Sequence, residues 1–267
     1  MLNALVDIAL EAGQAILEIY AAPDFDARAK DDGSPVTAAD AAAEKIILAK
    51  LKALYPDVPV VAEEEAAEGR IPDCDARLFL VDPLDGTKEF INRKGDFTVN
   101  IALIDAHAPV TGVVYAPALG LIYAGDRESG ARAGKVVDGK VTDWRPIKTR
   151  TPGATLDVVA SRSHMSAETV QFVERYKSTN LVNAGSSLKF CRVAAAEADL
   201  YPRLGRTMEW DTAAGDAVLR AAGGSVRTMD GKLLTYGKRR QADDVDFANP
   251  WFVAAGSFDP FTAAAKA

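Results

Sequence analysis

The sequence predicts a mixed α+β and α/β protein, with an N-terminal α+β domain over residues 1–152 and a smaller α/β domain over residues 153–267. Three observations predict this class. Apolar residues near the N-terminus recur at helical spacing, residues 97–137 form a series of short strand patterns, and strand and helix patterns alternate after residue 153. Such alternation predicts a partly parallel sheet.

The N-terminal elements begin with two helices. Apolar residues of the first fall on one helical face: Leu2, Leu5, Val6, Ala9, Gly13, Ile16, Leu17 and Tyr20. A polar loop follows, and a second helix is predicted from Thr37 to Leu54. Short apolar runs then predict strands at Val58–Ala62 and Leu78–Val81. These elements belong to the predicted N-terminal α+β domain.

The region from Phe97 to Val137 predicts a β-meander. Its strand segments are FTVNIALI, PVTGVVYA, LIYAG and ARAGKVV, and turn residues separate them. The segment Thr149–Gly153 contains Pro152 and is the best linker candidate. We therefore expect the domain boundary near residue 152.

The C-terminal elements alternate between strand and helix. Strands are predicted at 156–160, 180–184, 199–201 and 251–255, and helices at 167–177, 188–198 and 211–222. The last helix ends in Gly223-Gly224, which is a typical helix stop. Asp230-Gly231 predicts a hairpin turn.

Composition excludes several classes of protein. The 267 residues are 48% hydrophobic and 26% charged, which excludes disorder and fibrous repeats. A net charge of −7 argues against an electrostatic binder of nucleic acid polymers. Cys74 and Cys191 form no metal or redox motif and suggest reduced thiols. We find no signal peptide and no spanning segment, so we expect a soluble cytoplasmic protein, at most peripheral at the inner face of the cell membrane.

The most informative motif is Asp82-Pro83-Leu84-Asp85-Gly86-Thr87. A buried strand delivers Asp82 at its carboxyl end, where α/β sheets place ligands. Pro83 turns the chain so that Asp85 returns beside Asp82, and a helix starting at Thr87 offers amides to a phosphate. Two carboxylates and the Leu84 carbonyl suit Mg²⁺. The alternative is a strand, a turn and a helix cap with no chemistry.

Three other acidic positions have a structural explanation when each is taken alone. Glu63-Glu64-Glu65 follows a strand and resembles a solvated charge run. Asp211 precedes a helical pattern and is interpreted as its N-cap. Thr37 and Asp40 have the spacing of a capping box. Their combination with the Asp82 motif changes the interpretation.

That combination resembles the lithium-sensitive, Mg²⁺-dependent phosphatases of the inositol monophosphatase superfamily. The matching elements occur in the family's order: SPVTxxD at 34–40, Glu63-Glu64, DPLDGT at 82–87 and WDxAAG at 210–215. Further stretches resemble bacterial 3′(2′),5′-bisphosphate nucleotidases: KEF at 88–90, GVVYAP at 112–117, SRSH at 161–164, GSSLKFC at 185–191 and LYPR at 200–203. The resemblance implies the layered αβαβα sandwich of inositol monophosphatase and fructose-1,6-bisphosphatase.

The resemblance also implies roles for individual residues. Two or three Mg²⁺ ions would be bound by Glu63, Asp82, the Leu84 carbonyl, Asp85 and Asp211. Asp82 matches the carboxylate that bridges two ions, Glu63 serves the first, and Asp85 and Asp211 hold the second. Thr87, with Glu63 or Asp40, matches the residues that orient and deprotonate the attacking water. Metal coordination would lower the pKa of that water.

Substrate contacts are implied at a second set of positions. Lys189 follows the Gly185-Ser186-Ser187 turn and, with Arg203, suits a second phosphate. Without the resemblance, a helix cap and surface charge would explain Ser186, Lys189 and Arg203. The full expected set is Asp85, Gly86, Thr87, Lys88, Ser161, His164, Ser186, Lys189, Arg203 and Asp211.

The expected function is hydrolysis of adenosine 3′,5′-bisphosphate, with its sulfated relative as a further candidate, in sulfate assimilation. Inositol monophosphate or fructose bisphosphate hydrolysis is the alternative within the superfamily. A non-catalytic nucleotide or cation sensor is the alternative of another class, and the presence of every metal carboxylate counts against it. We expect a monomer or homodimer.

Overall fold

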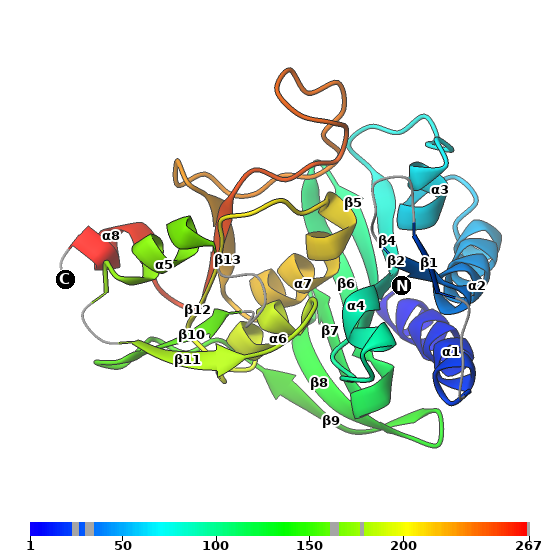
Figure 1. Cartoon of the computed structure of the whole chain (residues 1–267), viewed down its shortest axis with the longest axis horizontal. Helices are drawn as coiled ribbons and strands as arrows, with labels where there is room; N and C mark the ends of the chain where they lie inside the picture. Colours follow the sequence, from blue (N-terminus) through cyan, green and yellow to red (C-terminus); the bar gives the residue numbers. More distant parts are fainter. Residues whose placement is uncertain (23–26, 30–34, 161–165, 177–178, 266–267) are drawn as a thin grey trace.

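The computed structural model describes residues 1–22, 27–29, 35–160, 166–176 and 179–265 as five stacked layers. Figure 1 shows them from right to left: helices α1 and α2, a first sheet, helices α6 and α7, a second sheet, and helices α5 and α8. The expected αβαβα sandwich is therefore confirmed. Within the described residues, no helix is both long enough and apolar enough to cross a membrane.

The outer helical layer consists of α1 (Leu2–Tyr20) and α2 (Ala38–Leu54). Residues of both helices join the apolar core against the first sheet, as Leu5 and Ile47 illustrate. The predicted capping box at the start of α2 is confirmed, because Thr37 N donates to Asp40 Oδ2 and Thr37 Oγ1 accepts from Ala39 N. A short antiparallel pair, β1 (Ala27–Ala29) and β2 (Pro35–Thr37), precedes it.

The first sheet has seven strands in chain order. They are β3 (Val60–Ala62), β4 (Leu78–Asp85), β5 (Thr98–Asp105), β6 (Ala108–Ala116), β7 (Leu121–Asp126), β8 (Gly130–Val137) and β9 (Lys140–Ile147), with a 3₁₀ turn at Pro117–Leu119. The predicted meander is confirmed. β9 was not predicted, because Pro146 and the charged residues of this segment are typical of a loop. β9 lies at the edge of the sheet, where a strand tolerates both proline and charged residues.

The second sheet has five strands in the order β11-β10-β12-β14-β13. They are β10 (Leu156–Ala160), β11 (Thr179–Asn183), β12 (Leu200–Arg203), β13 (Ser225–Thr228) and β14 (Phe252–Ala255). β10 pairs in parallel with β11 and β12, which confirms the predicted mixed sheet. The predicted turn at Asp230-Gly231 is confirmed by the hydrogen bond from Gly231 N to Thr228 O.

The helices of the second half are α5 (Ala167–Val173), α6 (Leu188–Ala194), α7 (Glu209–Ala221) and α8 (Pro260–Ala265). The predictions for α5 and α6 were too long. α6 stops because Ala196 takes a positive φ of 60°, which ends a helix. α8 was not predicted.

α7 lies at the centre of the molecule and packs closely on the first sheet (Figure 1). Two glycines permit this approach. A Cβ on Gly112 would lie 2.6 Å from Ala214 O, and one on Gly125 would lie 2.6 Å from Val218 Cα. Asp211 is not the N-cap as predicted, because the helix starts at Glu209 and Asp211 is its third residue. The first turn of α7 thus faces the end of β4.

Candidate active site

β4 is longer than predicted and carries an irregularity where the site lies. Asp82 pairs with Asn100 and Asp85 with Thr98, and the register shifts between these pairs. Pro83 cannot donate a ladder hydrogen bond, so the strand bulges rather than ends there. Leu84 N then donates to Asp82 Oδ1 at 3.0 Å. The bulge holds the two aspartates of the motif near one another, as the sequence predicted.

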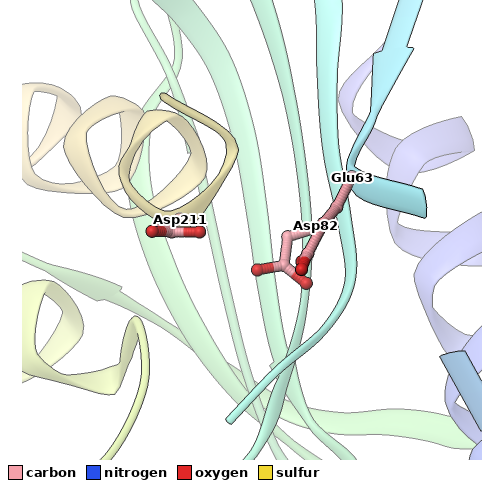
Figure 2. Close-up of side chains that lie close together, drawn as sticks. All are labelled: Glu63, Asp82 and Asp211. Atoms are coloured by element: carbon pink, nitrogen blue, oxygen red, sulfur yellow. The ribbon is translucent and has the colours of Figure 1, made fainter. Parts of the chain in front are cut away.

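Three acidic side chains from distant parts of the chain meet at this bulge. Glu63 opens the short helix α3 (Glu63–Ala67), Asp82 lies on β4, and Asp211 lies in the first turn of α7. One carboxylate oxygen from each lies within 4.8 Å of the others. Figure 2 shows Glu63 reaching toward Asp82 from one side and Asp211 facing them from the helix. Glu63 is therefore not part of a solvated charge run.

The electrostatics of this cluster favour a cation. Burial, and next the charge of Glu63, raises the pKa of Asp82 well above its usual range. Burial and next the charge of Asp85 do the same to the pKa of Asp211. Repulsion of this kind is relieved by a divalent ion, and carboxylate oxygens are the ligands that Mg²⁺ prefers. The donor set therefore fits a hard divalent cation.

Asp40 and Thr87 meet beside this cluster. Asp40 is 2% exposed, and its Oδ1 lies 3.4 Å from Thr87 Oγ1. Thr87 opens α4 (Thr87–Ile91), and its hydroxyl also lies 3.4 Å from Leu84 O. A hydroxyl in this place can donate a hydrogen bond to either oxygen, and only the carboxylate can also take up a proton. Long apo distances of this kind shorten in many substrate complexes.

Glu44 is a buried acid that sequence analysis missed. It accepts from Glu64 N at 3.0 Å and Glu65 N at 3.1 Å, and so caps α3 directly after Glu63. Burial raises the pKa of Glu44 to about 7. Its spacing of four from Asp40 puts both on one face of α2, and that was the available signal.

A cavity joins this cluster to the C-terminal half of the chain. Its lining contains Asp85, Gly86, Glu89, Gly185, Ser186, Lys189, Phe190, Tyr201, Arg203, Thr207, Asp211 and Thr212. The structure therefore brings together most of the substrate-contact positions expected from sequence. Thr207, Thr212, Tyr201 and Glu89 line the same cavity and were not singled out. Thr212 directly follows Asp211 in the sequence, which was a signal for it.

Two cations face the cavity. Lys189 is buried, and burial lowers its pKa to about 8, although the charge of Asp85 acts in the opposite direction. The alternative interpretation of Lys189 as a surface charge is therefore wrong. Arg203 donates from Nη2 to Arg206 O at 3.1 Å. Its Nε is buried and has no partner among the described residues.

Ser186 and Ser187 connect the two halves of the site. Ser186 Oγ lies 2.8 Å from Asp85 O and 2.7 Å from Asp96 O, as donor to these carbonyls. A Cβ on Gly86, whose φ is +96°, would lie 2.2 Å from this Oγ, so the contact requires a glycine. Ser187 Oγ donates to Asp211 O at 2.6 Å and accepts from Asn100 Nδ2 at 3.1 Å. Both hydroxyls thus hold the main chain of proposed ligands.

Among the described residues, two expected substrate contacts, Thr87 and Lys88, do not line this cavity. Lys88 is exposed and is not among the residues that line the cavity. Ser161 and His164 lie outside the described residues. The Leu84 side chain is buried, and its carbonyl lies beside Thr87.

Comparisons with known proteins identify the family. The model of the inositol monophosphatase family matches residues 1–256. The 3′(2′),5′-bisphosphate nucleotidase CysQ of Escherichia coli K12 is 45% identical, over 94% of this chain and 98% of that protein. The protein of the same name from Buchnera aphidicola is 38% identical, over 96% of this chain and 93% of that protein.

Solved structures agree with this result. A crystal structure of CysQ from Bacteroides thetaiotaomicron has a TM-score of 0.77 and 37% identity, covering 96% of this chain and 97% of that one. The inositol monophosphatase from Anabaena has a TM-score of 0.74 and 25% identity, covering 99% of this chain and 94% of that one. The chain therefore belongs to the inositol monophosphatase family.

Proposed function

We propose that this chain is a Mg²⁺-dependent 3′(2′),5′-bisphosphate nucleotidase that converts adenosine 3′,5′-bisphosphate to AMP and phosphate. The observation that carries the proposal is the cavity in which Lys189 and Arg203 face the acidic cluster. It offers cations for one phosphate beside a metal site for the other. The curated relatives that bear this activity in their names match nearly the whole chain.

The metal set that we propose is Glu63, Asp82, Asp85, Asp211 and the Leu84 carbonyl, for two or three Mg²⁺ ions. Mutual proximity of Glu63, Asp82 and Asp211 supports it, as do the raised pKa values of the buried aspartates. Mg²⁺ bound there would act as a Lewis acid, lowering the pKa of water and offsetting the negative charge of the phosphate. Ser187 and Met208 hold the Asp211 carbonyl and carboxylate in place.

The attacking water would be oriented by Thr87. Its hydroxyl accepts a proton from the water and passes its own toward Asp40, whose other oxygen is fixed by Thr37 N at 2.8 Å. Glu63 is the second candidate acceptor. The buried position of Asp40 keeps bulk water from competing for its carboxylate.

The second phosphate would be bound by Lys189 and Arg203. Ser161, His164 and Lys88 stay predictions as nucleotide contacts. We also propose that residues 1–152 and 153–267 form two domains with the site between them. The chain would act in the cytoplasm in sulfate assimilation, where the sulfated nucleotide is a further candidate substrate. Inositol monophosphate offers no second phosphate, so the cation pair disfavours it.

Arg203→Ala and Lys189→Met are expected to reduce kcat/KM for adenosine 3′,5′-bisphosphate. Loss of one charge-assisted contact costs on the order of 1.5–3 kcal/mol, or roughly 10- to 150-fold in kcat/KM. A monophosphate such as 3′-AMP has no group for these cations to bind. The measurement is therefore the loss on the bisphosphate divided by the loss on 3′-AMP, from phosphate release with Mg²⁺.

The matched control is Arg206→Ala. Arg206 is exposed, pairs with Asp244 at 2.9 Å and does not line the cavity, so its removal should change both substrates equally. A ratio near one for Arg203→Ala and Lys189→Met would overturn the phosphate assignment. A wild-type preference for inositol monophosphate over the nucleotide would overturn the proposed substrate.

A further inference from the structure

A segment close to the C-terminus contacts the first turn of α7 with both of its ends. We call residues 237–249 the α7 clasp; it follows the β13 hairpin and returns to β14 (Figure 1). Both of its ends contact the start of the helix that carries Asp211. Met208 and Ala248 form an isolated β-bridge, and Glu209 N donates to Phe247 O at 2.8 Å. The helix start is thus held by a remote part of the chain.

The first end of the clasp is held by a buried carboxylate. Glu209 is fully buried and accepts from Gly237 N at 2.6 Å and Lys238 N at 2.9 Å. The ammonium of Lys238 lies 2.7 Å from Glu209 Oε1. A buried acid with three donors is well satisfied, and breaking such a set is costly. The position of Glu209 is therefore strongly determined by the clasp.

The second end of the clasp is held by Asn249. This residue is 4% exposed, and its Nδ2 lies 2.8 Å from Met208 O, 3.0 Å from Thr212 Oγ1 and 3.3 Å from Thr207 Oγ1. Its Oδ1 accepts from Lys238 Nζ at 3.2 Å, which links the two ends. One amide thus contacts residues on both sides of Asp211.

These contacts surround the Asp211 carboxylate. Met208 N donates to Asp211 Oδ2 at 2.7 Å. Met208, whose carbonyl accepts from Asn249, therefore also orients Asp211. Thr207 and Thr212, the other two contacts of Asn249, line the cavity. Met208 stands at the N-cap position, where helices prefer Ser, Thr, Asp or Asn. The contacts of the clasp add to the local bond between Met208 N and Asp211 Oδ2 at this helix start.

We propose that the α7 clasp positions Asp211 for metal binding and that Asn249 and Lys238 are its positioning residues. The proposal rests on the proposed function in one respect, the assignment of Asp211 as a metal ligand. Contacts from the clasp to the neighbouring residues keep the Asp211 carboxylate in place and reduce the reorganisation required on binding.

The test is Mg²⁺ binding by isothermal titration calorimetry, without substrate, on Asn249→Ala and Lys238→Met. We expect the dissociation constant for Mg²⁺ to rise about tenfold in each, the lower end of the effect of removing partners that orient metal ligands. The control is Asp243→Asn. Asp243 lies in the clasp and is exposed, so its change should leave the constant within about twofold.

A second measurement uses the wild-type chain and so does not depend on the folding of variants. If metal binding stabilises the contacts of the clasp, and these contacts favour metal binding, the two effects are reciprocal. Mg²⁺ should then slow hydrogen exchange at the Gly237 and Lys238 amides. The Gly231 amide, which bonds to Thr228 O in the preceding hairpin, should be unaffected. Exchange unchanged by Mg²⁺ at Gly237 and Lys238 overturns the proposal.

Asp211→Asn separates this proposal from the assignment on which it rests. If Asp211→Asn weakens Mg²⁺ binding and Asn249→Ala does not, the clasp has no positioning role and the metal assignment stands. If Asp211→Asn leaves binding unchanged, Asp211 is not a ligand and both fail.

Discussion

Asp82→Asn is expected to abolish hydrolysis of adenosine 3′,5′-bisphosphate while leaving the chain folded. Asp82 is 1% exposed and lies at the centre of the acidic cluster, so the change removes one negative charge and preserves the shape. The oxygen that accepts from Leu84 N can also be kept. The loss should exceed the roughly 10²- to 10³-fold cost of deleting one electrostatic contact in an active site. Phosphate release at saturating Mg²⁺ measures it.

The same variant should unfold differently from wild type. Since burial raises the pKa of Asp82, the folded wild type binds its proton more tightly than the unfolded chain does. Without Mg²⁺, the stability contributed by this proton is present at acid pH and is lost as pH rises through the folded pKa. Asparagine does not ionise, so Asp82→Asn does not lose this stability as pH rises. In EDTA at neutral pH, its Tm should therefore equal or exceed that of wild type.

Added Mg²⁺ should then distinguish the two chains. It should raise the Tm of wild type, because it binds the folded state, and raise that of Asp82→Asn much less. The control is Asp105→Asn, an exposed acid at the end of the neighbouring strand β5, which should behave as wild type does. Near wild-type turnover in Asp82→Asn would show that Asp82 is not a metal ligand.

The parts of the site that sequence analysis predicted are those determined by local sequence. Pro83 was predicted to turn the chain so that Asp85 lies beside Asp82; the structure has a bulge within β4 there rather than a strand end. The capping box depends on the spacing of Thr37 and Asp40 alone. The meander follows from alternating strand patterns and turn residues, which explains why its strands were predicted well.

The parts that were missed depend on packing between distant segments. Burial of Lys189 results from the position of α6 between two sheets. The residue type alone does not distinguish a buried lysine from an exposed one. The role of Glu44 depends on α3 lying against α2. Asn249 contacts a helix whose start was itself misplaced by two residues, because Asp211 has the residue type of an N-cap.

Thr87→Ala is expected to lower kcat by roughly 10²- to 10⁴-fold, the usual cost of losing a positioned acid–base partner. The Thr87 hydroxyl lies between Asp40 Oδ1 and Leu84 O, and the methyl of alanine can neither donate a hydrogen bond nor pass a proton to Asp40. KM and the Mg²⁺ dissociation constant should change little, because the hydroxyl orients the water rather than holding an ion or the nucleotide. Initial rates and calorimetry measure the three quantities.

Thr87→Ser and Thr87→Val resolve whether the hydroxyl or the shape of the side chain matters. Serine keeps the hydroxyl and should recover most of kcat, whereas valine keeps the branched shape and should be as slow as alanine. A rise in KM with unchanged kcat in Thr87→Ala would indicate uniform binding and remove Thr87 from catalysis. Weakened Mg²⁺ binding instead would mean that Thr87 acts through the Leu84 carbonyl, 3.4 Å away, and not through Asp40.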